Sequence, residues 1–130
     1  MQHFVLISGG VLGLLAVVFG AFGAHALKKV LDREQQKSFE TGVKYQMYHS
    51  LILIMTGIVF PFLTSLQHLM AWCFLIGTFL FSFSIYGLVL SDSRGTKWRF
   101  LGPITPLGGL LLVIGWFLFV LNVGQLSDYL

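Results

Sequence analysis

Four long apolar stretches, none of which contains Asp, Glu, Lys or Arg, constrain this chain more than any other feature of its sequence. They cover approximately residues 4–24, 45–63, 69–90 and 100–121. A helix that crosses the hydrocarbon core needs about 20 mostly apolar residues, because each residue adds about 1.5 Å against a thickness of roughly 30 Å. In lipid, a helix satisfies its own backbone hydrogen bonds. The sequence therefore predicts an all-α fold, a four-transmembrane-helix bundle formed as a single integral membrane domain by residues 1–130.

The composition agrees with a membrane environment. The chain is 56% hydrophobic and only 10% charged, and its mean hydropathy is +0.85, which is far more apolar than a soluble domain. A net charge of +3 would suggest nucleic acid in a soluble protein, but here the charge comes from short loops. We therefore expect membrane lipids, with anionic headgroups, as partners and no nucleic acid. Ala24-His25-Ala26 resembles a signal-peptidase site, yet no basic segment precedes it, so we expect the first helix to be retained.

All eight Lys and Arg residues lie in two loops, 25–44 and 91–99. An even number of crossings separates these loops, so they share one side, and the positive-inside bias makes that side cytoplasmic. Both termini then lie outside, and residues 61–67 are expected to form a tight outer hairpin. Asp32 and Gln35 fit a capping box, which predicts that the second helix begins near Arg33, well before its apolar stretch.

Small residues recur in the first apolar stretch at alternating spacings of four and three, which places them on one helical face. The fourth stretch carries a shorter stripe of the same kind. Small side chains let another helix approach closely, so we interpret both stripes as helix-packing surfaces rather than ligand grooves. The first stripe is Gly9, Gly13, Ala16, Gly20 and Gly23, and the second includes Gly108 and Gly115.

Polar side chains within the apolar stretches cost free energy unless they are partnered, so their positions are informative. These polar residues lie where the first and third helices end and where the second and fourth begin. Because consecutive helices run in opposite directions, we expect all of them to lie toward the cytoplasmic side. We expect His49 to hydrogen-bond Tyr86 or a serine hydroxyl, and a shallow polar pocket to result. The alternative is that the same groups only hold the helices together. This candidate polar cluster consists of His25, Glu40, Tyr45, His49, Ser82, Tyr86 and Thr105.

No pattern for catalysis or for a cofactor accompanies this cluster. The sequence has no G-x-S-x-G elbow, no paired carboxylates and no acid-rich metal site. A haem held by His25 and His49 is disfavoured because the two residues lie at different depths in the membrane. A zinc site is disfavoured because the sequence offers too few ligands for it. Cys73 is the single cysteine, so no internal disulfide forms. We therefore expect a protein that is not an enzyme and has neither a metal nor a cofactor.

Four motifs occur in order along the chain: GAFGAHAL at 20–27, ETGVKYQMYH at 40–49, FSFSIY at 81–86, and TPLGG at 105–109 followed by Gly115-Trp116. Together they resemble the YgdD/YwdK-like family, small bacterial inner-membrane proteins grouped as a domain of unknown function, with a eukaryotic transmembrane relative. The resemblance covers almost the whole chain and implies a four-span protein of the bacterial inner (plasma) membrane, with no established activity. Phe83 departs from the family pattern, which has glycine between the two serines, and its size disfavours close helix approach there.

Two hypotheses for the function remain open at this point. The first is a non-enzymatic membrane protein that binds or passes a small solute, lipid or quinone at the cytoplasmic-side polar cluster. The second is an accessory or assembly subunit that packs against a larger membrane complex through its glycine stripe. A bundle of four short helices has a small core, so we also expect either a homo-oligomer or a membrane-complex partner.

Overall fold

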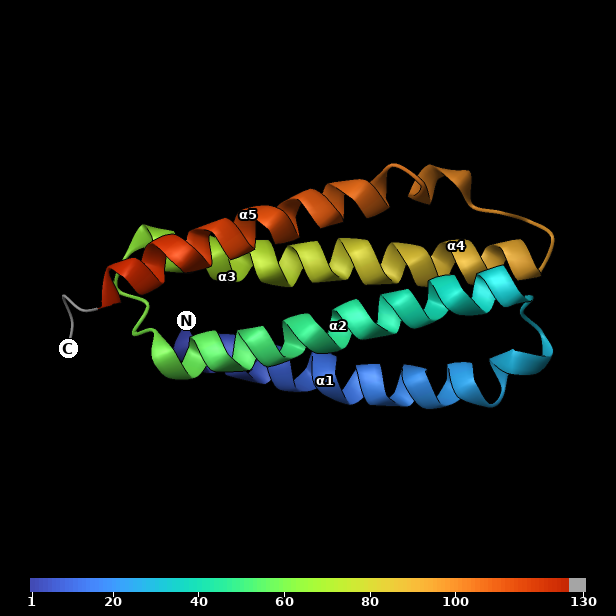
Figure 1. Ribbon diagram of the computed structural model, residues 1–130, viewed down its shortest axis with the longest axis horizontal. Helices are drawn as coiled ribbons and strands as arrows, with labels where there is room; N and C mark the ends of the chain where they lie inside the picture. The colour runs from blue at the N-terminus through green and yellow to red at the C-terminus, as the bar shows by residue number, and fades with distance from the viewer. Residues whose placement is uncertain (127–130) are drawn as a thin grey trace.

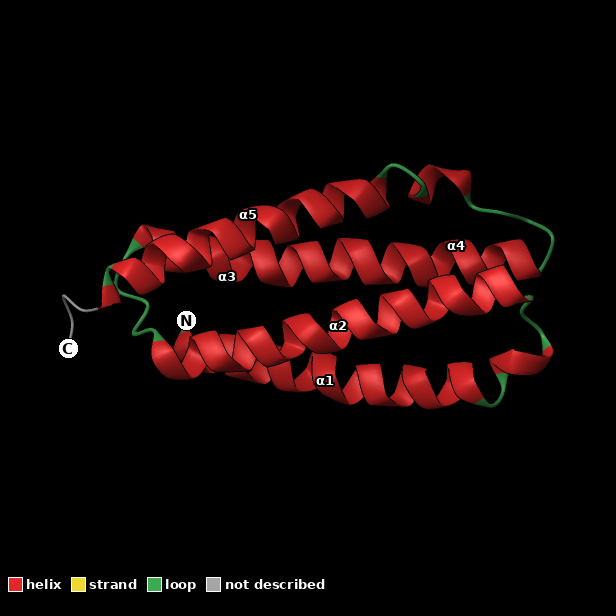
Figure 2. Ribbon diagram, viewed as in Figure 1, coloured by secondary structure: helices red, strands yellow, loops and turns green. Residues whose placement is uncertain are grey.

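The computed structural model describes residues 1–126 and, within them, four long helical segments that run side by side in alternating directions (Figure 1). Short loops and single helical turns join these segments (Figure 2). The α-helices are α1 (Gln2–Ala24), α2 (Arg33–Val59), α3 (Ser65–Thr78), α4 (Ser84–Ser93) and α5 (Ile104–Gly124). The shorter turns are η1 (Leu27–Lys29), η2 (Phe79–Phe83) and η3 (Arg99–Leu101).

The second segment, α2, begins where the capping box predicts. Asp32 accepts a hydrogen bond from the Gln35 backbone nitrogen at 2.8 Å, and the Gln35 side chain accepts from the Asp32 backbone nitrogen at 3.0 Å. The predicted end at residue 63 is wrong, because α2 stops at Val59. Phe60 is extended with ψ of 134°, as the residue before a proline prefers, and Pro61 follows it.

The third segment is one continuous rod from Ser65 to Ser93, longer than the predicted 69–90 at both ends. Thr64 caps its start by accepting a hydrogen bond from the Gln67 backbone nitrogen at 3.3 Å. Its middle, η2, is a π-helical turn. Such turns are rare within α-helices and alter which side chains face a neighbouring helix, and nothing in the residue pattern predicted this one.

The fourth segment, α5, starts at Ile104 rather than at residue 100, because the η3 turn and Pro103 precede it. Proline is favoured at the start of a helix, because the first backbone N–H groups have no acceptor within the helix and proline therefore removes no hydrogen bond there. The helix then continues to Gly124, three residues beyond the predicted end at residue 121.

The helices pack as two antiparallel hairpins, one formed by α1 and α2 and the other by the third segment and α5. The hairpins meet where α2 contacts α3, η2 and α4. Leu53, Met70 and Phe74, each almost fully buried, fill the centre of the larger core between them. A smaller core around Phe39 and Tyr86 fills the end near the charged loops.

Three helical segments of the described chain are long and apolar enough to cross a membrane: Gln2–Lys29, Ser65–Ser93 and Arg99–Gly124. The segment α2 is equally long, with 27 residues, but it carries charge in its first half and Gln46 and His49 farther along. Both basic loops lie at one end of the bundle, whereas the N-terminus and the end of α5 lie at the other (Figure 1).

Candidate functional site

A fully buried glutamine, Gln46 on α2, connects three helices near the centre of the bundle. Its Nε2 donates to the backbone carbonyl of Leu12 on α1 at 2.8 Å. Its Oε1 accepts a hydrogen bond from the hydroxyl of Tyr86 on α4 at 2.7 Å. Sequence reasoning missed Gln46, although an amide inside an apolar stretch is itself a signal, since such a group requires partners in lipid.

Three serines tie further helix pairs together. Ser50 on α2 donates to the Gly9 carbonyl of α1 at 2.9 Å, and Ser82 in η2 donates to the Gly42 carbonyl of α2 at 2.7 Å. Ser84 and Thr105 share a hydrogen bond of 2.6 Å between α4 and α5. Each hydroxyl therefore has a protein partner, which makes it part of the packing between helices.

His49 faces α5 and not α4. Its Nδ1 lies 2.7 Å from the Tyr45 backbone carbonyl, and its Nε2 accepts from the Trp116 indole nitrogen at 3.2 Å. The expected hydrogen bond from His49 to Tyr86 or a serine hydroxyl is therefore wrong, because the Tyr86 hydroxyl donates to Gln46 and both ring nitrogens of His49 have other partners. The predicted position of His49 near the charged loops is also wrong, since its partner Trp116 lies midway along α5.

The other members of the predicted cluster do not converge on one pocket. His25, Glu40 and Tyr45 are exposed, and the exposed His25 at the end of α1 is remote from His49, which faces α5. Tyr45 packs against Phe81 of η2 in a tilted arrangement, with ring centroids 4.8 Å apart. The polar cluster of the sequence thus separates into buried pairs inside the bundle and isolated groups on its surface.

The glycine stripe of α1 lies against α2. A Cβ added at Gly9 would come within 3.0 Å of the Ser50 carbonyl, and one at Gly13 would meet the Ser50 hydroxyl at 2.6 Å. Nearer the loops, Gly20 faces Val43 and Gly23 faces Phe39, and Ala16, between Gly13 and Gly20, is buried. The stripe is therefore occupied within the chain.

The stripe of α5 is occupied in the same way by the third segment. A Cβ at Gly108 would meet the Gly77 carbonyl at 2.9 Å, and one at Gly115 would meet the Phe74 ring at 2.9 Å. Phe83, where close approach was not expected, lies on the other side of this segment and packs on Phe19 of α1.

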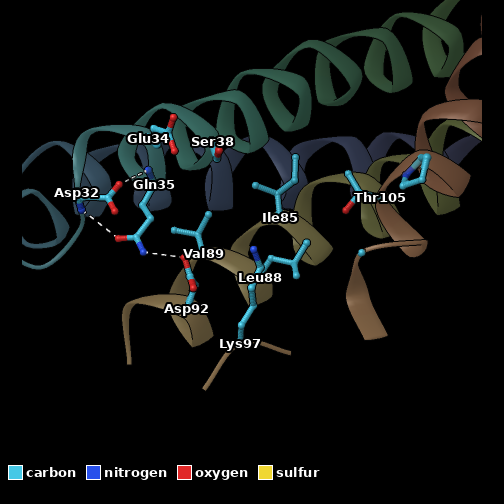
Figure 3. A pocket seen from close by; sticks show the side chains of 12 residues that line it. Asp32, Glu34, Gln35, Ser38, Ile85, Leu88, Val89, Asp92, Lys97 and Thr105 are labelled. Carbon is cyan, nitrogen blue, oxygen red and sulfur yellow. Dashed lines mark hydrogen bonds between the residues drawn. The ribbon is translucent and has the colours of Figure 1, made fainter. Parts of the chain in front are cut away.

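A loop-side groove of about 500 Å³ opens where α2, α4 and the start of α5 meet (Figure 3). Of the predicted cluster, only Thr105 lines it. One wall is apolar and comes from α4, whereas the rim near the loops carries carboxylates and one lysine. Its lining includes Asp32, Gln35, Ser38, Ile85, Leu88, Asp92 and Lys97.

The rim of the loop-side groove is held by Gln35. The side chain that completes the capping box also donates from Nε2 to the Asp92 carboxylate of α4 at 2.9 Å. One amide therefore joins the first turn of α2 to the last turn of α4 (Figure 3). This bridge positions the carboxylates of Asp32 and Asp92 on one side of the groove.

An apolar groove of about 320 Å³ lies on the other side of the contact between α2 and α4. Its lining comes from α1, η1, α2, η2 and α4 and contains no charged residue. The apolar groove is lined by Phe19, Phe22, Leu27, Phe39, Phe83, Tyr86 and Leu90.

Residues 19–109 match the family described as "Protein of unknown function (DUF423)". The chain belongs to this family. Its sequence is 36% identical to the UPF0382 membrane protein SH2409 of Staphylococcus haemolyticus, over 94% of this chain and 95% of that protein. It is 35% identical to the UPF0382 inner membrane protein YgdD of Escherichia coli strain K12, over 97% of this chain and 93% of that protein. No solved structure matches the chain.

The DUF423 relatives confirm the resemblance that the four sequence motifs indicated. Their names describe membrane proteins, and in Escherichia coli an inner-membrane protein. Together with the three long apolar helical segments, this makes the chain a helical membrane protein of an uncharacterised family.

Proposed function

We propose that this chain is a four-span inner-membrane protein without enzymatic activity that binds a small solute, lipid or quinone in its loop-side groove. The observation that carries the proposal is the groove itself, about 500 Å³ in volume, with polar and apolar walls. Pockets for small molecules combine an apolar lining with a few placed polar groups. The buried polar groups around Gln46 and His49 already have partners within the bundle, which favours the loop-side groove over these groups as the ligand site.

The four-span arrangement is supported by the length and the contacts of α2. Its 27 residues extend about 40 Å at 1.5 Å per residue, enough to cross the hydrocarbon core and project beyond it. It packs along α1, a helix without Asp, Glu, Lys or Arg that is long and apolar enough to cross a membrane. With α2 crossing, both basic loops share a side, and the positive-inside bias makes that side cytoplasmic.

The chemistry of the loop-side groove favours an amphiphile whose polar end donates hydrogen bonds. Asp32 and Asp92 present carboxylate oxygens, and an ionised carboxylate accepts hydrogen bonds but donates none. Ile85 and Leu88 supply apolar surface. The groove lies at the loop end of the bundle, where lipid headgroups would surround it. A molecule could therefore place its tail toward the membrane and its polar end toward the carboxylates.

The test is a comparison of small molecules retained by the protein in native nanodiscs. Leu88→Trp places a large ring in the loop-side groove, and Leu107→Trp, at an exposed position of α5, is the matched control. We expect a molecule that co-purifies with the wild type and the control, and is lost from Leu88→Trp. Equal retention by all three proteins would contradict the proposal.

The accessory-subunit hypothesis depended on a free glycine stripe. Within the described chain that stripe is packed on α2, so no specific surface favours this role over ligand binding.

A further inference from the structure

The apolar groove presents only hydrophobic surface, although a tyrosine lies in its wall. The hydroxyl of Tyr86 donates to Gln46 in the bundle, so the groove meets the ring of Tyr86 and not its polar atom. Phe19 packs on this ring with centroids 5.2 Å apart, and Phe39 does so at 5.0 Å. These contacts fix the wall and leave a space suited to a hydrocarbon chain.

Three basic residues lie close to residues that line the apolar groove, whereas the acid beside the lining residue Phe39, Glu40, lines a different hollow together with Lys44. Leu27 lines the groove and is followed at once by Lys28 and Lys29, both exposed. On α4, Leu90 lines the apolar groove, and the exposed Arg94 follows it by one helical turn. Leu90 and Arg94 also line a neighbouring hollow together.

The position of the basic turn is fixed by α2. The side-chain amide of Gln36 donates to the backbone carbonyls of Lys28 at 3.0 Å and Leu31 at 3.1 Å. The nearest acidic residue on α4, Asp92, accepts from Gln35 in the loop-side groove. It therefore faces away from the apolar groove, and the basic border is not neutralised from that helix.

We propose that the apolar groove holds one acyl chain of an anionic phospholipid, whose phosphate is bound by Lys28, Lys29 and Arg94. The groove lies at the end of the bundle that meets the headgroup region, and basic residues there attract anionic lipid. A second copy of this chain would bring its own basic loop and repel the first. A neutral amphiphile would gain nothing from the basic border.

The experiment measures lipid binding to the full chain by native mass spectrometry. The probes are dioleoyl-phosphatidylglycerol and dioleoyl-phosphatidylcholine, which share acyl chains and differ in charge. Each basic residue near a membrane surface contributes about five-fold in affinity for anionic lipid. We therefore expect the double substitution Lys28→Gln/Lys29→Gln to reduce the preference for phosphatidylglycerol roughly 25-fold.

The matched control is Lys37→Gln/Lys44→Gln, which removes the same charge from the neighbouring helix α2. Lys44 lines a different hollow, beside Gly20 and Glu40, so this variant should keep the preference. Leu27→Trp fills the apolar groove and should reduce binding of both lipids, whereas Leu88→Trp, in the loop-side groove, should not. The last contrast separates this proposal from the proposed function.

Three outcomes would overturn the proposal. The first is equal binding of the two lipids by the wild type, which would make the occupant a neutral amphiphile. The second is an equal loss of preference in both double variants, which would indicate a general effect of charge. The third is a dimer that Leu27→Trp dissociates, which would make the occupant a second copy. Circular dichroism of each variant establishes that it retains the helical fold.

Discussion

Trp116 of α5 donates its indole hydrogen to Nε2 of His49 on α2 at 3.2 Å, and this bond joins the two hairpins of the bundle. The second ring nitrogen of His49 lies 2.7 Å from the Tyr45 carbonyl. A carbonyl only accepts and an indole N–H only donates. The hydrogen of the neutral imidazole is therefore on Nδ1, and both nitrogens are used.

Trp116→Phe should weaken the contact between the hairpins. The substitution retains most of the aromatic packing on Phe74 but leaves His49 Nε2 without its donor. Hydrogen bonds between membrane helices contribute about 0.6 kcal/mol on average and up to ~1.7 kcal/mol, so we expect a decrease in unfolding free energy within that range. Unfolding in mixed micelles with increasing dodecyl sulfate, followed by circular dichroism, measures it. Trp72→Phe makes the same change at a ring that packs beside Phe4 and is as exposed as Trp116, 42% against 43%. Since the Trp72 indole has no hydrogen-bond partner among residues 1–126, this variant should have a smaller effect.

Tyr86→Phe should destabilise the bundle more than Gln46→Leu/Tyr86→Phe does. The single substitution leaves the buried Oε1 of Gln46 without its donor, which costs about 1–3 kcal/mol. The double substitution removes both polar groups, and the Leu12 carbonyl remains in the hydrogen-bonding pattern of α1. The same unfolding assay measures the coupling between the two sites. Additive losses would mean that the two side chains are not bonded.

The helices could be predicted from the sequence because each depends on local patterns. Charge-free stretches located the four segments, and the capping box of Asp32 and Gln35 located the start of α2 nearly 12 residues before its apolar stretch. The helix ends were less predictable, since the charge-free stretches run past Pro61 and Pro103, whereas α2 ends before the first proline and α5 begins after the second.

The partners of the polar side chains could not be predicted from the same patterns. His49 and Tyr86 both carry polar groups on neighbouring helices, but the rotation of each helix decides which pairs meet. The rotation of the third segment changes at its π-helical turn, η2, and the position of α5 brings Trp116 to His49. These are tertiary relationships. The spacing of residues along one helix shows which side chains share a face, but not which face of a neighbouring helix they meet.

Gly108→Ala should separate α5 from the third segment. A Cβ at this position would meet the backbone at the Gly77 carbonyl, 2.9 Å away, and at Leu80, and backbone atoms cannot move aside as a side chain can. Overpacking of this kind costs about 1–3 kcal/mol. Gly10→Ala is the control, since nothing lies within 4 Å of its added Cβ and alanine favours a helix. An equal decrease in unfolding free energy for both variants would contradict the packing role of Gly108.

Gln35→Ala should loosen the first turn of α2, because it removes both the capping bond to Asp32 and the bridge to Asp92. We expect faster hydrogen exchange at the amides of residues 33–36, measured by mass spectrometry on the protein in nanodiscs. Asp92→Ala removes only the bridge and should cause a smaller increase. Ser38→Ala, on the same wall of the loop-side groove, should leave the exchange rates unchanged.

The side of the membrane on which each loop lies can be tested with single cysteines in a Cys73→Ala background. Lys28→Cys and Lys97→Cys report on the basic loops, His3→Cys on the N-terminus, and Ser65→Cys, at the first residue of α3, on the end of the bundle where α2 meets α3. The positive-inside bias predicts that an impermeant maleimide labels positions 3 and 65 in intact cells, and positions 28 and 97 only after permeabilisation.

Position 65 decides whether α2 crosses the membrane. If α2 instead lay along the surface, Ser65 would share a side with Lys28, and the two cysteines would be labelled together. The hydrogen bonds of Gln46 and Ser50 to α1 hold α2 along a helix that is long and apolar enough to cross a membrane. We therefore expect Ser65→Cys to be labelled with His3→Cys, because α2 cannot leave the membrane without breaking these bonds.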